Sequence, residues 1–184
     1  MSEAGVQVGV ARARAGAVFG RPVRPVDAAA VLTKLAEVPD PELPMLSVVD
    51  LGIIHRIDVG TGPGPIRIEI LPTFVGCPAL ELIKASIAEK VATLGRPVEV
   101  VATFEVPWTS DRISAAGRDA LAAAGIAPPG SGPDQALIAL EPRVPCPYCG
   151  SRDTVLDNLF GPTQCRTIRF CRGCRQPFEA IKPV

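Results

Sequence analysis

Two pairs of closely spaced cysteines near the C-terminal end constrain the fold of this 184-residue chain more than any other feature. Cys146 and Cys149 form one pair, Cys171 and Cys174 form the other, and 21 residues separate the pairs. Two residues between cysteines let a tight turn direct both sulfur atoms at one ion, and two such turns complete a tetrahedron of ligands. Residues 135–184 are too few to form a stable domain from a hydrophobic core alone, and a bound metal would stabilise the fold. We therefore expect a four-cysteine zinc ribbon over residues 135–184.

The identity of the metal and the role of a fifth nearby sulfur stay open. Four thiolates leave no coordination position for water, which is typical of structural rather than catalytic zinc. An iron ion in a rubredoxin-like site, or an iron–sulfur cluster, accepts the same four ligands. Cys165 is surplus to a four-cysteine site. It is either a buried structural thiol in a ribbon strand, or an alternate ligand or metal-transfer thiol.

Hydrophobic periodicity upstream of the ribbon predicts an α+β domain over residues 26–124. The expected order is a helix after Asp27, strands over 53–59 and 66–70, a helix over 78–94, a strand over 98–104 and a helix that Asp111 caps and Gly125 ends. This is a small α-β-β-α-β-α sandwich with helices packed over one sheet. Residues 1–25 have no stable period and are expected to be a flexible tail. Residues 125–134 are rich in Pro and Gly and predict a linker.

The charges cancel, with 19 Lys and Arg against 19 Asp and Glu, which argues against a generic nucleic-acid or membrane-surface binder. Residues 141–184 nevertheless carry seven basic and four acidic residues, and a nucleic-acid-binding ribbon stays an alternative. Its basic face would be formed by Arg166, Arg169, Arg172 and Arg175. No apolar stretch approaches the roughly 20 residues of a membrane span, and the N-terminus lacks the apolar run of a secretory signal. We expect a cytoplasmic protein with reduced thiols.

A sixth cysteine, Cys77, stands alone between a predicted strand and a predicted helix with Pro78 at its first position. A helix start favours the thiolate and predicts a lowered pKa for Cys77. Such a thiolate either binds a metal or attacks a substrate; otherwise Cys77 is a small buried hydrophobe. The one histidine, His55, lies in a predicted strand, so a Cys–His enzyme is not favoured. Asp50 either caps backbone N–H groups or supplies an oxygen ligand near Cys77.

These motifs carry two resemblances. Residues 40–42, 49–54 and 76–78 are similar to the iron–sulfur-assembly domain of SufT-like and cytosolic iron–sulfur targeting factors. Nearly the whole chain past the tail resembles the PaaD-type (PaaJ) subunit family of bacterial phenylacetyl-CoA epoxidase. The motifs that carry this second resemblance lie at residues 107–111, 117–118, 125–129, 146–151, 160–165 and 171–178.

The second resemblance implies a non-catalytic accessory protein of aerobic phenylacetate catabolism. In that system a di-iron oxygenase epoxidises the ring of phenylacetyl-CoA and an iron–sulfur reductase supplies electrons, and the PaaD-type component helps to assemble or maintain a metal centre in these partners. The chain has neither the carboxylates and histidines of a di-iron site nor a dinucleotide fingerprint, which agrees with that role. A structural scaffold within the oxygenase complex is the alternative.

The resemblance also assigns the cysteines. It places the iron or iron–sulfur-binding cysteine of the first domain at Cys77 and the extra ribbon cysteine at Cys165. The ribbon ligands fall on Cys146, Cys149, Cys171 and Cys174.

Overall fold

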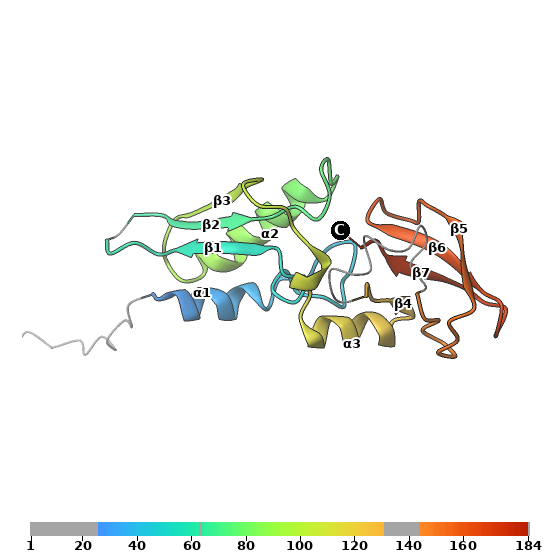
Figure 1. The fold of residues 1–184 in the computed structure, drawn as a ribbon. Helices are drawn as coiled ribbons and strands as arrows, with labels where there is room; N and C mark the ends of the chain where they lie inside the picture. Colours follow the sequence, from blue (N-terminus) through green and yellow to red (C-terminus); the bar gives the residue numbers. More distant parts are fainter. Residues whose placement is uncertain (1–25, 63, 131–143, 184) are drawn as a thin grey trace, which may run out of the picture.

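A computed structural model describes residues 26–62, 64–130 and 144–183 (Figure 1). The expected tail at 1–25, the end of the expected linker at 131–134 and the expected start of the ribbon at 135 lie outside these ranges. The described chain is α+β, with two separate sheets, and the predicted α-β-β-α-β-α order is confirmed for the first of its two parts.

The first sheet has the order β1-β2-β3. Strands β1 (Ile54–Asp58) and β2 (Ile66–Ile70) form an antiparallel hairpin, and β3 (Val98–Ala102) lies parallel to β2. Parallel neighbours need a crossover connection, and helix α2 (Leu80–Ala92) supplies it. The three isoleucines of β2 that face inward are completely buried, as the period-two pattern of this strand predicts.

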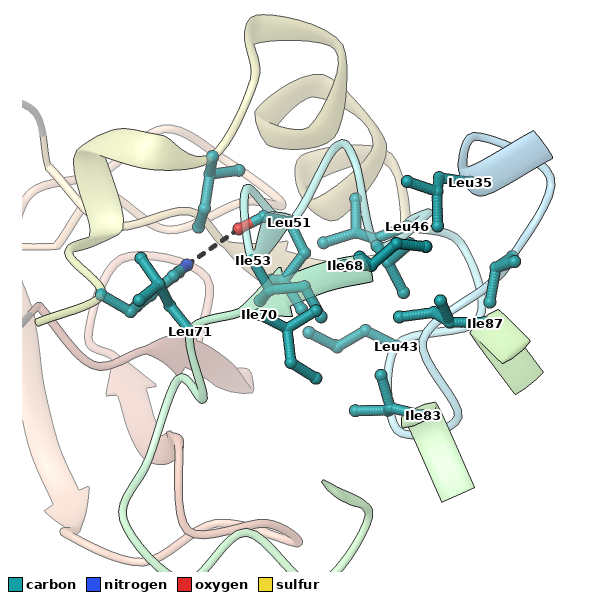
Figure 2. Packing of buried hydrophobic residues seen from close by; sticks show 14 of the residues in the cluster. Leu35, Leu43, Leu46, Leu51, Ile53, Ile68, Ile70, Leu71, Ile83 and Ile87 are labelled. Carbon is teal, nitrogen blue, oxygen red and sulfur yellow. Dashed lines mark hydrogen bonds between the residues drawn. The ribbon is translucent and has the colours of Figure 1, made fainter. Parts of the chain in front are cut away.

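The main core lies between this sheet, α1 (Ala28–Leu35) and α2, and it also contains the long loop that precedes β1. Figure 2 shows the packing, in which Leu35 of α1, Ile83 and Ile87 of α2 and Ile68 of β2 converge. The loop contributes Leu43, Leu46, Val48, Leu51 and Ile53. Each fully buried aliphatic side chain contributes about 1.5–3 kcal/mol, so these residues anchor the loop in the core. The segment that carries Asp40 and Asp50 is therefore packed into the main core.

Helix caps follow the sequence prediction at one helix and differ at another. Asp27 caps α1, because its carboxylate accepts a hydrogen bond from the amide of Ala30 at 2.8 Å. The expected cap Asp111 lies instead in a short 3-10 turn, η1 (Ser110–Arg112). Helix α3 (Ala115–Ala123) begins after Ser114, whose hydroxyl accepts from the amide of Gly117 at 2.9 Å.

The second sheet has the order β4-β7-β6-β5. Strands β5 (Thr154–Asn158), β6 (Arg166–Cys171) and β7 (Pro177–Ile181) form the antiparallel part, and β4 (Ile126–Ala127) joins parallel to β7 at the edge. The sequence predicts a linker at residues 126 and 127, but these residues form a strand of the ribbon sheet. Ile126 and Ile181 also belong to the main core, which places the two parts of the chain in direct contact.

Across the described ranges, no helix combines the length and the hydropathy that a membrane span requires.

Candidate metal centre and thiol cavity

The four paired cysteines converge on one point. The Sγ atoms of Cys146 and Cys174 are 3.7 Å apart, those of Cys149 and Cys171 are 3.6 Å apart, and all four lie within 4.8 Å of one another. A metal–sulfur bond of about 2.3 Å gives a regular tetrahedron an edge of about 3.8 Å. Two of the separations match this edge and none exceeds it by more than about 1 Å, so the chain has a four-cysteine cluster placed to bind one tetrahedral ion.

Two similar backbone turns place these sulfur atoms. In the first turn the amide of Gly150 donates to the carbonyl of Cys146 at 2.9 Å, and in the second the amide of Arg175 donates to Cys171 at 2.8 Å. Gly150 and Arg175 both have left-handed backbone angles, with φ of 71° and 60°. A glycine accepts this conformation without strain, whereas Arg175 adopts it at a cost. The second turn therefore carries backbone strain that a bound metal, by fixing both cysteines, would compensate.

Cys171 and Cys174 have very different pKa values, because their surroundings in the cluster differ. The amide of Cys174 donates to the sulfur of Cys171 at 3.5 Å and lowers the pKa of Cys171 to about 7. Burial and the three neighbouring sulfur atoms raise the pKa of Cys174 to about 12. A divalent cation replaces the protons of all four thiols, so all four sulfur atoms bind it as thiolates despite these different pKa values. Four thiolates in this geometry accept zinc, an iron ion or an iron–sulfur cluster, so the distances identify a metal site without choosing its metal.

A second feature is a cavity of about 570 Å³ that lies where the two parts of the chain meet. Its walls come from the loop before β1, the loop between β2 and α2, the segment after β3, and the ribbon. Most of its lining is apolar, including Leu43, Phe74 and Trp108. Cys77 from the first part and Cys165 from the ribbon both line it. The two cysteines outside the metal cluster therefore share one cavity.

Cys77 is half-buried, and its pKa is raised rather than lowered. Burial is the main cause; the charges of Glu42 and Asp40 and the neighbouring Cys165 act in the same direction, whereas the amide of Ala79 opposes them. Helix α2 starts at Leu80, three residues beyond Cys77, so the cysteine is not at the first turn. The expected lowering of the Cys77 pKa is therefore wrong, because desolvation outweighs the helix start.

Cys165 lies in the turn just before β6 rather than in a strand. Its sulfur is 3.1 Å from the hydroxyl of Thr163, and its carbonyl accepts from the amide of Lys182 at 2.9 Å. Burial raises the pKa of Cys165, and Glu42 raises it further, while Thr163 and Arg166 lower it. The backbone around Cys165 is thus fixed to the end of β7, with its thiol at the cavity wall.

Asp50 takes a different place from the one expected of a metal ligand. Its two carboxylate oxygens accept hydrogen bonds from the hydroxyls of Ser47 at 2.7 Å and Ser114 at 2.8 Å, which lower the pKa of Asp50. Asp50 is absent from the residues that line the cavity with Cys77. Its carboxylate also binds hydroxyls rather than backbone N–H groups, so neither expected role describes it. Asp50 joins the loop before β1 to the start of α3.

Two carboxylates that sequence reasoning did not assign, Asp40 and Glu42, line the cavity instead. Oδ1 of Asp40 accepts from the amides of Glu42 and Leu43, each at 2.8 Å. Asp40 is only 5% exposed, and burial raises its pKa. The Asp-Pro-Glu sequence is a recognisable turn signal, but nothing in it indicates that the turn faces two cysteines.

The four arginines near the second cysteine pair do not form one basic face. Arg166 is largely buried and pairs with Glu179 at 2.7 Å. Arg169 is 5% exposed, whereas Arg172 and Arg175 are exposed. Half of the proposed basic surface is therefore inside the ribbon, which removes the main structural support for a nucleic-acid-binding face.

Two family models match consecutive parts of the chain. Residues 28–102 match a model described as iron–sulfur cluster assembly protein, and residues 130–182 match the PaaD zinc beta ribbon domain. An Escherichia coli (strain K12) protein, described as a component of 1,2-phenylacetyl-CoA epoxidase, is 37% identical over 151 residues, which cover 82% of this chain and 89% of that protein. A Porphyromonas gingivalis Fe–S protein maturation auxiliary factor is 34% identical over 86 residues, or 46% of this chain and 80% of that protein.

Solved structures resemble part of the chain. A domain of unknown function from Bacillus anthracis is 25% identical, with a TM-score of 0.47, over 50% of this chain and 89% of that one. A Mycobacterium tuberculosis protein described as associated with Fe–S complex assembly and repair is 31% identical, with a TM-score of 0.33, over 53% of this chain and 84% of that one.

Proposed function

The chain belongs to the PaaD-type family of 1,2-phenylacetyl-CoA epoxidase components, and from this membership we propose that it is a non-catalytic accessory factor of phenylacetate catabolism. Its task would be to help assemble or maintain an iron or iron–sulfur centre in the oxygenase or the reductase of that system. The match of residues 28–102 to an iron–sulfur cluster assembly model supports this task. The work requires reduced thiols, which the cytoplasm maintains.

The observation that carries the proposal is the position of Cys77. This thiol lies half-buried in a cavity at the junction of the two parts of the chain, with the carboxylates Asp40 and Glu42 on the same walls. A raised pKa keeps Cys77 protonated and unreactive at neutral pH until a cation replaces the proton. Such a thiol suits transient binding of a metal cargo better than attack on a substrate.

The four-cysteine cluster serves a different purpose in this proposal. Zinc bound there would close the coordination sphere with four protein ligands and neutralise thiolates that otherwise repel one another. The ribbon would then be a stable platform that holds the cavity wall and contacts a client. Anaerobic purification followed by elemental analysis is expected to find zinc in this site.

The test replaces Cys77 in cells that use phenylacetate as carbon source. Cys77→Ser is expected to leave the fold and the ribbon metal intact but to abolish growth, while Glu89→Gln, an exposed change on α2, keeps wild-type growth. Wild-type growth of the Cys77→Ser strain would overturn the assignment of Cys77. If cells without the protein still contain fully metal-loaded epoxidase components, and the protein co-purifies with the oxygenase at fixed stoichiometry, the scaffold alternative replaces the proposal.

A further inference from the structure

We propose that Cys77 and Cys165, together with the carboxylate of Glu42, form a second metal site that binds a divalent first-row cation between the two parts of the chain. The inference rests on the proposed function and deepens it, because it names the ligands that hold the cargo. It also gives the ribbon a second role, because Cys165 of the ribbon would supply one of the ligands. The four-cysteine cluster is not part of this second site.

The three side chains reach one cavity from three separate segments. Glu42 comes from the loop before β1, Cys77 from the loop between β2 and α2, and Cys165 from the turn before β6. Figure 1 shows the loop between β2 and α2 on the side of the first sheet that faces the ribbon strands. Each half of the chain thus contributes one thiol, and neither half alone contains both.

The backbone at each proposed ligand is fixed by local hydrogen bonds. Asp40 orders the turn that carries Glu42, by accepting from two successive amides. The amide of Cys77 donates to the carbonyl of Phe74 at 3.2 Å, and the carbonyl of Cys165 accepts from Lys182. The backbone that carries each proposed ligand is thus held in place before a cation binds. Asp40 acts as a positioning residue, because its Oδ1 is already engaged.

Glu42 is close enough to both sulfur atoms for its charge to act on each of them. At neutral pH both thiols keep their protons, so without a cation the carboxylate faces two neutral groups. When a cation replaces those protons, the carboxylate can bind it beside the two thiolates. The three side chains therefore offer one cation two sulfur ligands and one oxygen ligand.

The chemistry of the three donor groups determines which cations the site can bind, and the two thiolates balance the charge of a divalent cation. Two thiolates and one carboxylate suit zinc or ferrous iron, whereas magnesium and calcium prefer oxygen ligands alone. Binding forms two metal–sulfur bonds and releases the two thiol protons to solvent, so the charge of the two-thiol part is unchanged. Three protein ligands leave one tetrahedral position free, unlike the closed four-cysteine cluster. A free position lets a client's side chain take over the ion.

The site is not preassembled in the way the ribbon cluster is. Within the described ranges, the group of potential ligands that is already close enough to hold an ion consists of the four paired cysteines, and it does not include Cys77, Cys165 or Glu42. Binding must therefore draw the side chains together. We expect this site to bind its cation more weakly than the ribbon and to exchange it faster, as a carrier of cargo requires.

Cobalt(II) titration of the full chain, with zinc already in the ribbon, tests the site directly. A thiolate-to-cobalt charge-transfer band is expected for the wild type and is expected to be lost in the Cys77→Ser, Cys165→Ser double variant. Each single variant should weaken cobalt binding at least about tenfold, since even outer-shell changes cost about 10–100-fold in affinity. An unchanged band in the double variant would mean that cobalt enters only the ribbon, and the second site would be refuted.

The Glu42→Gln variant tests whether Glu42 is a ligand of the cation or only a charge near it. A divalent cation replaces two protons, so a carboxylate that is merely nearby changes the affinity little at fixed pH, whereas loss of a ligand weakens binding at least about tenfold. Glu89→Gln is the matched control on the exposed face of α2. Equal affinity in Glu42→Gln and Glu89→Gln would remove Glu42 from the site.

The outcomes also distinguish this inference from the proposed function. If Cys77→Ser abolishes growth on phenylacetate but Cys165→Ser retains both growth and cobalt binding, the accessory function stands and the two-thiol site is wrong. If the double variant loses cobalt binding but cells with Cys77→Ser grow normally, the site exists and the proposed function is wrong.

Discussion

Replacement of Gly52 by alanine is expected to be one of the most damaging small changes in the protein. Gly52 has φ of 71°, a conformation that costs a residue with a Cβ atom about 1–2 kcal/mol. An added Cβ would also lie 2.2 Å from the carbonyl oxygen of Arg112 and 2.6 Å from its carbonyl carbon. Because both atoms belong to the backbone, the collision cannot be relieved by rotation of a side chain.

The collision would push η1 away from the loop before β1 and break the hydrogen bonds between them. Arg112 donates from Nε to the carbonyl of Gly52 at 2.8 Å and from Nη2 to Ile54 at 3.0 Å, and Trp108 donates from Nε1 to Leu51 at 3.0 Å. At about 0.5–1.5 kcal/mol for each bond, and with the backbone strain added, the free energy of unfolding should fall by about 3–6 kcal/mol.

Urea denaturation at saturating zinc measures this loss, and Gly60→Ala is the matched control. Gly60 has a similar φ of 60°, but no atom lies within 4 Å of the position of its added Cβ. Gly60→Ala should therefore show the backbone strain alone, about 1–2 kcal/mol. If Gly52→Ala and Gly60→Ala lose stability equally, the close approach between Gly52 and Arg112 is not what holds η1 in place.

Three further predictions concern the candidate sites. The pH dependence of Cys77 alkylation by iodoacetamide should show an apparent pKa above the ordinary cysteine value. Glu42→Gln should lower this pKa, because the carboxylate disfavours the thiolate. An unchanged pH dependence in Glu42→Gln would contradict the proximity of the two groups. Asp50→Asn should destabilise the protein near neutral pH by about 1–3 kcal/mol. Because the folded-state pKa of Asp50 is lowered, the difference from wild type should shrink as pH falls through that pKa, and a pH-independent difference in urea denaturation would argue against the charged hydrogen bonds. Cys171→Ser should lose the ribbon metal and the near-ultraviolet signal of the ribbon, and retention of one tightly bound zinc would contradict the four-cysteine assignment.

Local signals in the sequence predicted the metal cluster and most of the elements of the first part. The two cysteine pairs specify their own turns, and Asp27 is followed directly by the helix that it caps. At α3 the sequence prediction named Asp111 as the cap, but Ser114, which is also a good cap residue, begins the helix. The tertiary hydrogen bond from Ser114 to Asp50 decides in favour of Ser114, and no local pattern contains it.

The features that were missed all depend on contacts between distant segments. The lowered pKa expected for Cys77 followed from its place before a helix, but burial raises the pKa of this thiol, and Glu42 and Asp40 of the loop before β1 and Cys165 of the ribbon raise it further. The short strand β4 lies in a Pro- and Gly-rich segment and forms because β7 offers a free edge. Cys77 and Cys165 line one cavity because β4, which follows α3, pairs with β7 and holds the ribbon beside the first part of the chain.

The most direct test of the account measures iron in the epoxidase components rather than in this protein. The oxygenase and the reductase are purified anaerobically from cells that carry the wild-type chain or Cys77→Ser, and the iron content of each is determined by elemental analysis. A clear loss of iron from at least one component is expected in the Cys77→Ser cells, with the ribbon metal of the variant retained. Full iron occupancy of both components in those cells would contradict it.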